Sequence, residues 1–114
     1  MSEREKIEFL RDIDIAIERI ENYVKGLTYA DFLTDLKTQD ATIRNLEIIG
    51  EAVKHLPNDF RKRYPQIPWK KIAGARDRLI HGYFGVNFDI VWTIITEDFP
   101  SLKLALKKIL VEYE

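Results

Sequence analysis

Apolar residues recur with helical spacing along most of this 114-residue chain, and no segment alternates with period two for long enough to demand a β-strand. The clearest stripe lies between residues 3 and 24, where apolar residues follow one another at steps of four, four, three and four: Phe9, Ile13, Ile17, Ile20 and Val24. Such a stripe buries one face of an α-helix and leaves the opposite face in water. The spacing therefore predicts an all-α protein.

The same spacing predicts four further helices, over residues 29–36, 38–56, 68–81 and 88–113. Pro100 must break or kink the last of them, because proline has no amide hydrogen to donate to the carbonyl of Thr96. Residues 57–68 contain three prolines and predict a connection with at most one helical turn. Gly50 and Gly74 lie inside predicted helices, where we expect them to allow close helix approach. We expect a single domain over residues 1–114, an antiparallel up-and-down bundle of four to five helices.

Composition narrows the class of protein further. Apolar residues make up 46% of the chain, too many for a disordered protein. The absence of cysteine excludes disulfides, thiolate metal sites and cysteine nucleophiles. No apolar run approaches the roughly 20 residues of a membrane helix, and the first residues do not resemble a signal peptide. We therefore expect a soluble, cytoplasmic protein that makes no contact with a membrane.

Charge is unevenly distributed along the chain. The 18 Lys and Arg residues nearly balance the 19 Asp and Glu residues, which argues against a protein that coats nucleic acid through bulk charge. Residues 61–78 nevertheless hold seven basic residues and one acid, a net +6 against −7 for the remainder: Arg61, Lys62, Arg63, Lys70, Lys71, Arg76, Arg78 and the acid Asp77. This segment predicts either a site for a local anionic ligand or a solvated basic face.

The end of this basic segment carries an arginine and one of the chain's two histidines, Arg76 and His81. On an ideal helix these positions diverge by about 140°, so their side chains do not easily meet at one phosphate. They could meet if the helix unwinds at Gly82 or if a second chain supplies the missing group. Spacing alone does not separate this arrangement from a histidine that only caps a helix.

The small number of histidines limits how a single chain could catalyse RNA cleavage. RNA cleavage without a metal needs a base for the 2′-hydroxyl, an acid for the leaving oxygen, and cations around the phosphorane. A symmetric dimer with this helix at its two-fold axis would bring together two copies each of His81 and Arg76. The helix dipole would also favour the charged form of His81 near a helix C-terminus.

The arrangement Arg76-x4-His81-x-Tyr83 resembles the R-x4-H-x-Y signature of HepT-like toxins in the HEPN superfamily. Three neighbouring segments are similar to that family as well: residues 44–53 (RNLEIIGEAV), residues 67–74 (IPWKKIAG), and residues 82–87 (GYFGVN) with Trp92 beyond them. Together these segments extend over most of residues 40–110. The polar residue after the motif arginine, Asp77, also fits the family pattern.

The resemblance implies a homodimeric helical bundle that acts as a metal-independent endoribonuclease toxin of a type VII toxin–antitoxin system, with no cofactor. Carried over by position, His81 would be the general acid/base and Arg76 the phosphate and transition-state clamp, with Asp77 and Arg78 in support. The composite cleft of the dimer would leave a 2′,3′-cyclic phosphate on the RNA. A minimal nucleotidyltransferase antitoxin would silence the toxin by transferring AMP to Tyr83.

Further candidates are Arg44, Lys70 and Lys71, which could bind RNA phosphates. Glu47 and Glu51 stand four residues apart, but no histidine lies at matching spacing, so salt bridges with Arg44 and Lys54 are favoured over a metal site. His55 ends a predicted helix, where its interaction with the helix dipole explains it without a catalytic role.

Two alternative functions remain open on the sequence alone. One is a non-catalytic module that uses the same basic helix to present a nucleotide or nucleic acid to a partner nucleotidyltransferase. The other is a plain helical dimerisation domain in which residues 61–78 are only a solvated face.

Overall fold

The computed structural model describes the backbone of residues 1–81 and 86–113 and, within them, every side chain except those of residues 75, 76 and 78–81. All regular structure in these ranges is helical, which confirms the all-α prediction. In chain order the elements are α1 (Glu3–Val24), α2 (Tyr29–Leu33), α3 (Leu36–His55), α4 (Asn58–Arg63), α5 (Trp69–His81), α6 (Phe88–Thr93), the π-helical turn η1 (Ile94–Asp98) and α7 (Phe99–Glu112).

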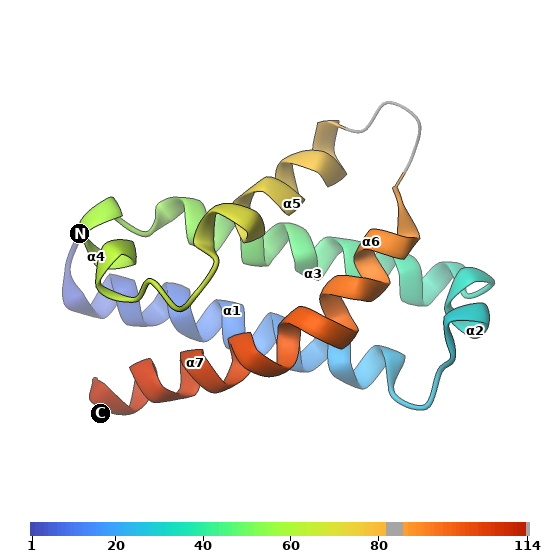
Figure 1. Cartoon of the computed structure of the whole chain (residues 1–114), viewed down its shortest axis with the longest axis horizontal. Coiled ribbons are helices and arrows are strands. Elements are labelled where there is room, and N and C mark those ends of the chain that lie inside the picture. Colours follow the sequence, from blue (N-terminus) through green and yellow to red (C-terminus); the bar gives the residue numbers. More distant parts are fainter. Residues whose placement is uncertain (82–85, 114) are drawn as a thin grey trace.

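The long helices run up and down in sequence (Figure 1). α1 and α3 lie antiparallel and form the most extensive helix pair, and α3 also packs against α5. α5 returns across α3 at an oblique angle, and α6, η1 and α7 then lead back across α1. α3 is therefore the helix that joins α1 to α5.

The core consists of the apolar stripes that the sequence predicts. Ile13, Ile17 and Ile20 of α1 are buried, while Phe9 and Val24 at the two ends of that stripe are partly buried. The stripe of α3 contributes Leu46, Ile49, Ala52 and Val53, and that of α7 contributes Leu102, Leu106 and Ile109. Burial of these faces, at roughly 25 cal/mol per Å² of apolar surface, is the main force that holds the helices together.

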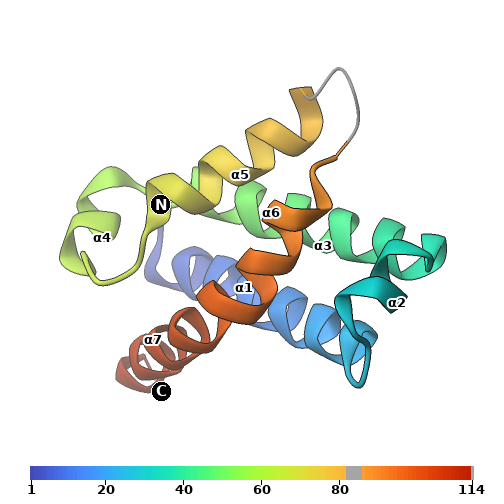
Figure 2. The same cartoon turned by 45° about the vertical axis from the view of Figure 1, so that its right-hand side comes forward.

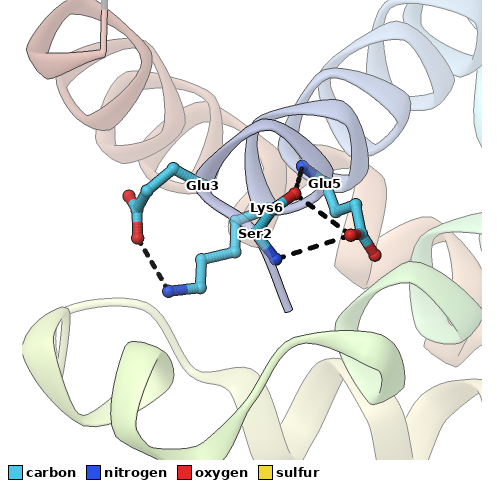
Figure 3. Close-up of polar contacts among 4 residues, drawn as sticks. All are labelled: Ser2, Glu3, Glu5 and Lys6. Atoms are coloured by element: carbon cyan, nitrogen blue, oxygen red, sulfur yellow. Dashed lines mark hydrogen bonds and ion pairs between the residues drawn. The ribbon is translucent and has the colours of Figure 1, made fainter.

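The N-terminus of α1 is fixed by local polar contacts (Figure 3). Ser2 and Glu5 form a capping box, in which the Ser2 hydroxyl accepts from the Glu5 amide at 3.1 Å. Lys6 donates to the Glu3 carboxylate at 2.9 Å, which lowers the pKa of Glu3 below its usual value. The Lys6 ammonium also lies 5.8 Å from the centre of the Phe60 ring in α4, so Lys6 links the start of α1 to α4.

The proline-containing connection over residues 57–68 contains α4, whose six residues exceed the single turn that the sequence predicts. Phe60 is fully buried. The indole Nε1 of Trp69 donates to the backbone carbonyls of Arg61 at 3.0 Å and Tyr64 at 3.1 Å. These two contacts satisfy carbonyls at the end of α4 and hold α4 against the start of α5.

Pro100 is accommodated by a π-helical turn instead of a break. η1 lies between α6 and α7, and the Phe99 amide donates to the carbonyl of Ile94, five residues back. Pro100 then occupies the first turn of α7, where its missing amide hydrogen costs little. The chain therefore stays helical from α6 to α7 and bends between them (Figure 2).

An aromatic cluster joins α2 to α6. Phe32 is fully buried, and its ring centroid lies 5.7 Å from Phe88 in an edge-to-face arrangement and 5.2 Å from Trp92. Nearby, the Tyr29 hydroxyl donates to the Asp89 carboxylate, and this hydrogen bond raises the pKa of Tyr29 above its usual value. The cluster fixes the start of α6, directly after the segment that follows α5.

The expectation that Gly74 permits close helix approach is wrong for the described part of this chain. No described residue lies within 4 Å of where its Cβ would stand, so no described helix approaches α5 closely at this position. Among the described residues, no helix is both long and apolar enough to cross a membrane.

We expect Phe32→Ala to lower the free energy of unfolding by about 3–5 kcal/mol, because it leaves a cavity beside Phe88 and Trp92. Leu36→Ala is the matched control, since Leu36 is 72% exposed, and it should change stability by no more than about 0.5 kcal/mol. Urea denaturation of both variants measures this. Equal effects of the two substitutions would contradict the assignment of Phe32 to the core.

Candidate functional site

The motif positions lie in the second half of α5 and just beyond it. The backbone is helical through Arg76, Asp77, Arg78 and His81, and His81 is the last residue of the helix. This confirms the predicted helix over residues 68–81 to within one residue. The side chains of Arg76, Arg78 and His81, and the whole of Tyr83, lie outside the described residues. The predicted convergence of Arg76 and His81 therefore stays a prediction.

Asp77 is the motif residue whose side chain the structure describes. Its carboxylate forms an ion pair with the Lys54 ammonium of α3. Both side chains are partly exposed, at 45% for Asp77 and 38% for Lys54, so water screens the pair. The contact joins α5 to α3 across the helix pair and limits how α5 can rotate about its own axis.

Ion pairs along α3 agree in part with the sequence analysis. Arg44 pairs with Glu47 at 3.7 Å, as expected. Lys54 instead reaches across to α5, and the Glu51 carboxylate lies 3.3 Å from Nε2 of His55. His55 ends α3, as predicted, and stacks on Phe9 with centroids 5.1 Å apart. No group of three or more metal-ligating side chains gathers among the described residues.

Of the predicted phosphate contacts, Lys70 and Lys71 lie together in the first turn of α5, and Arg44 lies apart from them on α3. Lys71 pairs with Asp98 of η1 at 3.1 Å, so the turn that accommodates Pro100 also supplies a carboxylate to α5. Below this pair a cavity of about 40 Å³ lies between α3, α5 and η1. Its walls are mostly apolar, and it is too small for a nucleotide.

Lys70 and Lys71 also line an open groove of about 660 Å³ between α4 and the start of α5. Arg61 and Lys62 of α4 line the same groove. Both residues belong to the basic segment over residues 61–78, but their positions in the sequence do not single them out as site residues. Only the fold shows that α4 turns back beside α5 and brings the two basic clusters together.

The chain matches the family model described as "HepT-like: Ribonuclease HepT-like" over residues 13–109. A "Probable ribonuclease HepT" of Thermococcus cleftensis is 51% identical over 102 residues, which cover 90% of this chain and 93% of that protein. A Methanocaldococcus jannaschii protein named as a candidate RNase is 46% identical over 106 residues, covering 93% of this chain and 88% of that protein.

Among solved structures, the chain is similar to the tri-AMPylated HEPN toxin of Shewanella oneidensis, which was solved in complex with its MNT antitoxin. The TM-score is 0.68 and the match covers 100% of both chains at 20% sequence identity. A likeness at this level of identity establishes the fold. It therefore confirms the HEPN-like helical architecture that the motif segments imply.

We expect the Lys54–Asp77 pair to contribute about 0.2–1 kcal/mol of coupling free energy, because both side chains are partly exposed. A double-mutant cycle with Lys54→Met and Asp77→Asn isolates this coupling from the other effects of each substitution. The coupling should shrink in 1 M salt, where the screening length falls to about 3 Å. A coupling of zero at low salt would show that the pair does not hold α5 to α3.

Proposed function

The chain belongs to the HepT-like ribonuclease family, and from that premise we propose that it is a metal-independent endoribonuclease toxin. Two copies would form one composite cleft, lined by the Arg76 and His81 of both. The observation that carries this proposal is the family match over residues 13–109, a range that includes every motif position. The relative named as a probable ribonuclease is 51% identical to this chain. Such an enzyme would act in the cytoplasm, where RNA is available.

The reaction requires two proton transfers on opposite sides of the phosphate. The neutral imidazole of one His81 takes the proton of the RNA 2′-hydroxyl, whose oxygen then attacks the adjacent phosphorus. The bond from phosphorus to the 5′-oxygen breaks, and the protonated imidazole of the partner subunit's His81 gives that oxygen its proton. The products are a 2′,3′-cyclic phosphate and a free 5′-hydroxyl, and no metal enters the step.

A pair of histidines in one cleft supplies both protonation states at once. The C-terminal end of α5 favours the charged form of an imidazole at position 81. Two imidazolium ions close together repel each other, so charging one disfavours charging the second. In such a cleft this repulsion would favour the singly protonated pair over the doubly charged one, and the singly protonated pair is the state that the reaction uses.

The remaining residues serve binding and positioning in this proposal. Arg76 would contact the phosphate and stabilise the charge that builds up on the phosphorane. Asp77 and Arg78 would support it, Asp77 through the ion pair with Lys54 that joins α5 to α3. Lys70, Lys71 and Arg44 would add contacts to other phosphates of the RNA.

We further propose that a nucleotidyltransferase antitoxin silences this chain by modifying Tyr83. The phenolic oxygen would attack the α-phosphorus of ATP, with loss of pyrophosphate, and would then carry AMP. The added phosphate is negatively charged and would repel RNA from a cleft built of arginine and histidine. The Shewanella oneidensis relative, which is tri-AMPylated and bound to an MNT antitoxin, supports this proposal.

His81→Ala should reduce RNA cleavage in EDTA by about 10²–10⁴-fold or more, because it removes both proton transfers from the cleft. His55→Ala is the matched control, since His55 ends α3, where it stacks on Phe9 and pairs with Glu51. Gel analysis of a labelled RNA measures cleavage, with circular dichroism to confirm that both variants fold. Unchanged cleavage by the His81 variant would contradict the catalytic assignment.

The same assay separates the non-catalytic alternative from the ribonuclease. If the wild-type protein never cuts RNA but Arg76→Ala weakens its binding to RNA or to a nucleotide, the chain is a binding module. If neither cleavage nor binding is found, the chain is a dimerisation domain whose basic segment is only a solvated face.

Incubation with the cognate nucleotidyltransferase and ATP should add AMP to the wild-type chain but not to Tyr83→Phe, because phenylalanine lacks the attacking oxygen. Tyr23→Phe is the control, since Tyr23 is a 40% exposed tyrosine on α1, and it should be modified like the wild type. Mass spectrometry of the intact chain measures the addition. AMP found on the Tyr83 variant in equal amount would assign the modification to another residue.

A further inference from the structure

Among the residues that the structure describes, the groove between α4 and the start of α5 is lined by basic residues and by no acidic ones. Four cationic side chains line it, together with one asparagine and apolar residues: Arg61, Lys62, Lys70 and Lys71. Lys62 and Lys70 are exposed, and within the described part of the chain neither forms an ion pair. Lys71 pairs with Asp98, and Arg61 donates to the side chain of Asn58. The groove therefore offers two positive charges without an acidic partner among the described residues, on Lys62 and Lys70. The charges of Lys71 and Arg61 lie in the same groove but have hydrogen-bond or ion-pair partners.

The backbone that carries these charges is fixed. Phe60 anchors α4 in the core, with the Lys6 ammonium and the Arg63 guanidinium 5.8 Å and 5.6 Å from its ring centre. The Trp69 indole hydrogen-bonds to two carbonyls at the end of α4 and so ties α4 to α5. Both walls of the groove consequently keep their spacing, and a ligand would not have to order them before it binds.

The chemistry of the groove suits a polyanion better than a protein surface. Protein interfaces draw most of their affinity from apolar and aromatic anchors that are exposed before binding. The groove's largest apolar residues, Ile67 and Trp69, are only 3% and 7% exposed and belong to the core. Its exposed apolar lining comes from two prolines, Pro65 and Pro68, and from the aliphatic parts of the basic side chains, and among the described residues it includes no exposed aromatic one. A phosphate backbone needs only positive charge at intervals, which lysine side chains on a fixed frame supply.

The groove and the motif positions lie at the two ends of one helix, α5. Lys70 and position 81 are eleven residues apart, which is about three turns and about 16 Å along the helix. Gly74 lies between them on the same side of α5, and among the described residues nothing lies within 4 Å of where its Cβ would stand. A stacked nucleic-acid strand at about 3.4 Å per nucleotide would span this distance with about five nucleotides.

We propose that this groove binds the phosphate backbone of the RNA substrate about five nucleotides from the cleaved bond. The proposal rests on the ribonuclease function above and adds to it a second point of contact, with Lys62 and Lys70 as its main charges. Because phosphates are the same in every sequence, the groove holds and orients the strand without selecting its bases. The groove would therefore favour RNA long enough to reach from α4 to the end of α5.

The test compares Lys62→Gln/Lys70→Gln with the wild-type chain, using a 20-nucleotide RNA of mixed sequence whose 2′-hydroxyls are methylated so that it cannot be cut. Fluorescence anisotropy at several salt concentrations gives Kd. Losing two phosphate contacts on a single strand should lower the slope of log affinity against log salt by about 1.4. At low salt Kd should rise about five- to tenfold.

Lys107→Gln/Lys108→Gln is the control, because both lysines are exposed on α7 and the change in net charge is the same. Its Kd should stay within twofold of the wild type. An equal effect of the two double variants, or none from the groove variant, would overturn the proposal. So would a groove variant that binds RNA normally but fails to bind the nucleotidyltransferase, a result that would assign the groove to that protein.

These outcomes are separate from those that test the ribonuclease. Binding to an uncleavable RNA needs no proton transfer, so a groove effect without any cleavage would overturn the ribonuclease and leave the groove. Normal cleavage of ordinary RNA with no groove effect would overturn the groove and leave the ribonuclease.

Discussion

The packing of α3 between α1 and α5 is the constraint on which the rest of the structure depends. Its apolar stripe buries Ile49 and Val53 almost completely. Three polar side chains of α3 are buried as well: Gln39, Thr42 and Asn45. The Gln39 amide donates to the Phe32 carbonyl at 2.8 Å. Thr42 Oγ1 and Asn45 Oδ1 have no hydrogen-bond partner in the described residues. Because α3 holds α1 on one side and α5 on the other, the position of the motif helix follows from this packing.

The sequence predicted the parts of the fold that depend on local spacing. The helix over residues 3–24 and the end of α5 follow from apolar periodicity and from the glycine that comes after, and both are confirmed by the structure. The turn at Pro100 could be located but not described, because a proline is compatible with a break, a kink or a π turn. Which one forms depends on how α6 and α7 pack, and periodicity carries no information about that packing.

In the candidate site, too, the sequence predicts what is local and leaves open what depends on the packing of the helices. The motif residues could be named from the sequence, since their identity and spacing are local. The ion pair between Asp77 and Lys54 could not be predicted from the sequence. Lys54 lies 23 residues before Asp77, and its obvious local partner was Glu51. Likewise, the basic segment was evident as a net charge of +6, but its division between Lys62 on α4 and Lys70 on α5 emerges only when α4 folds back. Near-neutrality of the whole chain thus coexists with a local concentration of positive charge between α4 and α5.

In the proposed enzyme one active site is built from two chains, and subunit mixing tests this most directly. Wild-type protein is re-equilibrated with increasing amounts of His81→Ala protein, and cleavage is measured per wild-type chain. A composite site predicts that this activity falls toward zero as hybrid dimers replace wild-type dimers, because each hybrid keeps one of the two imidazoles. Activity per wild-type chain that stays constant at every mixing ratio would show that each chain cuts RNA alone, and would contradict the account.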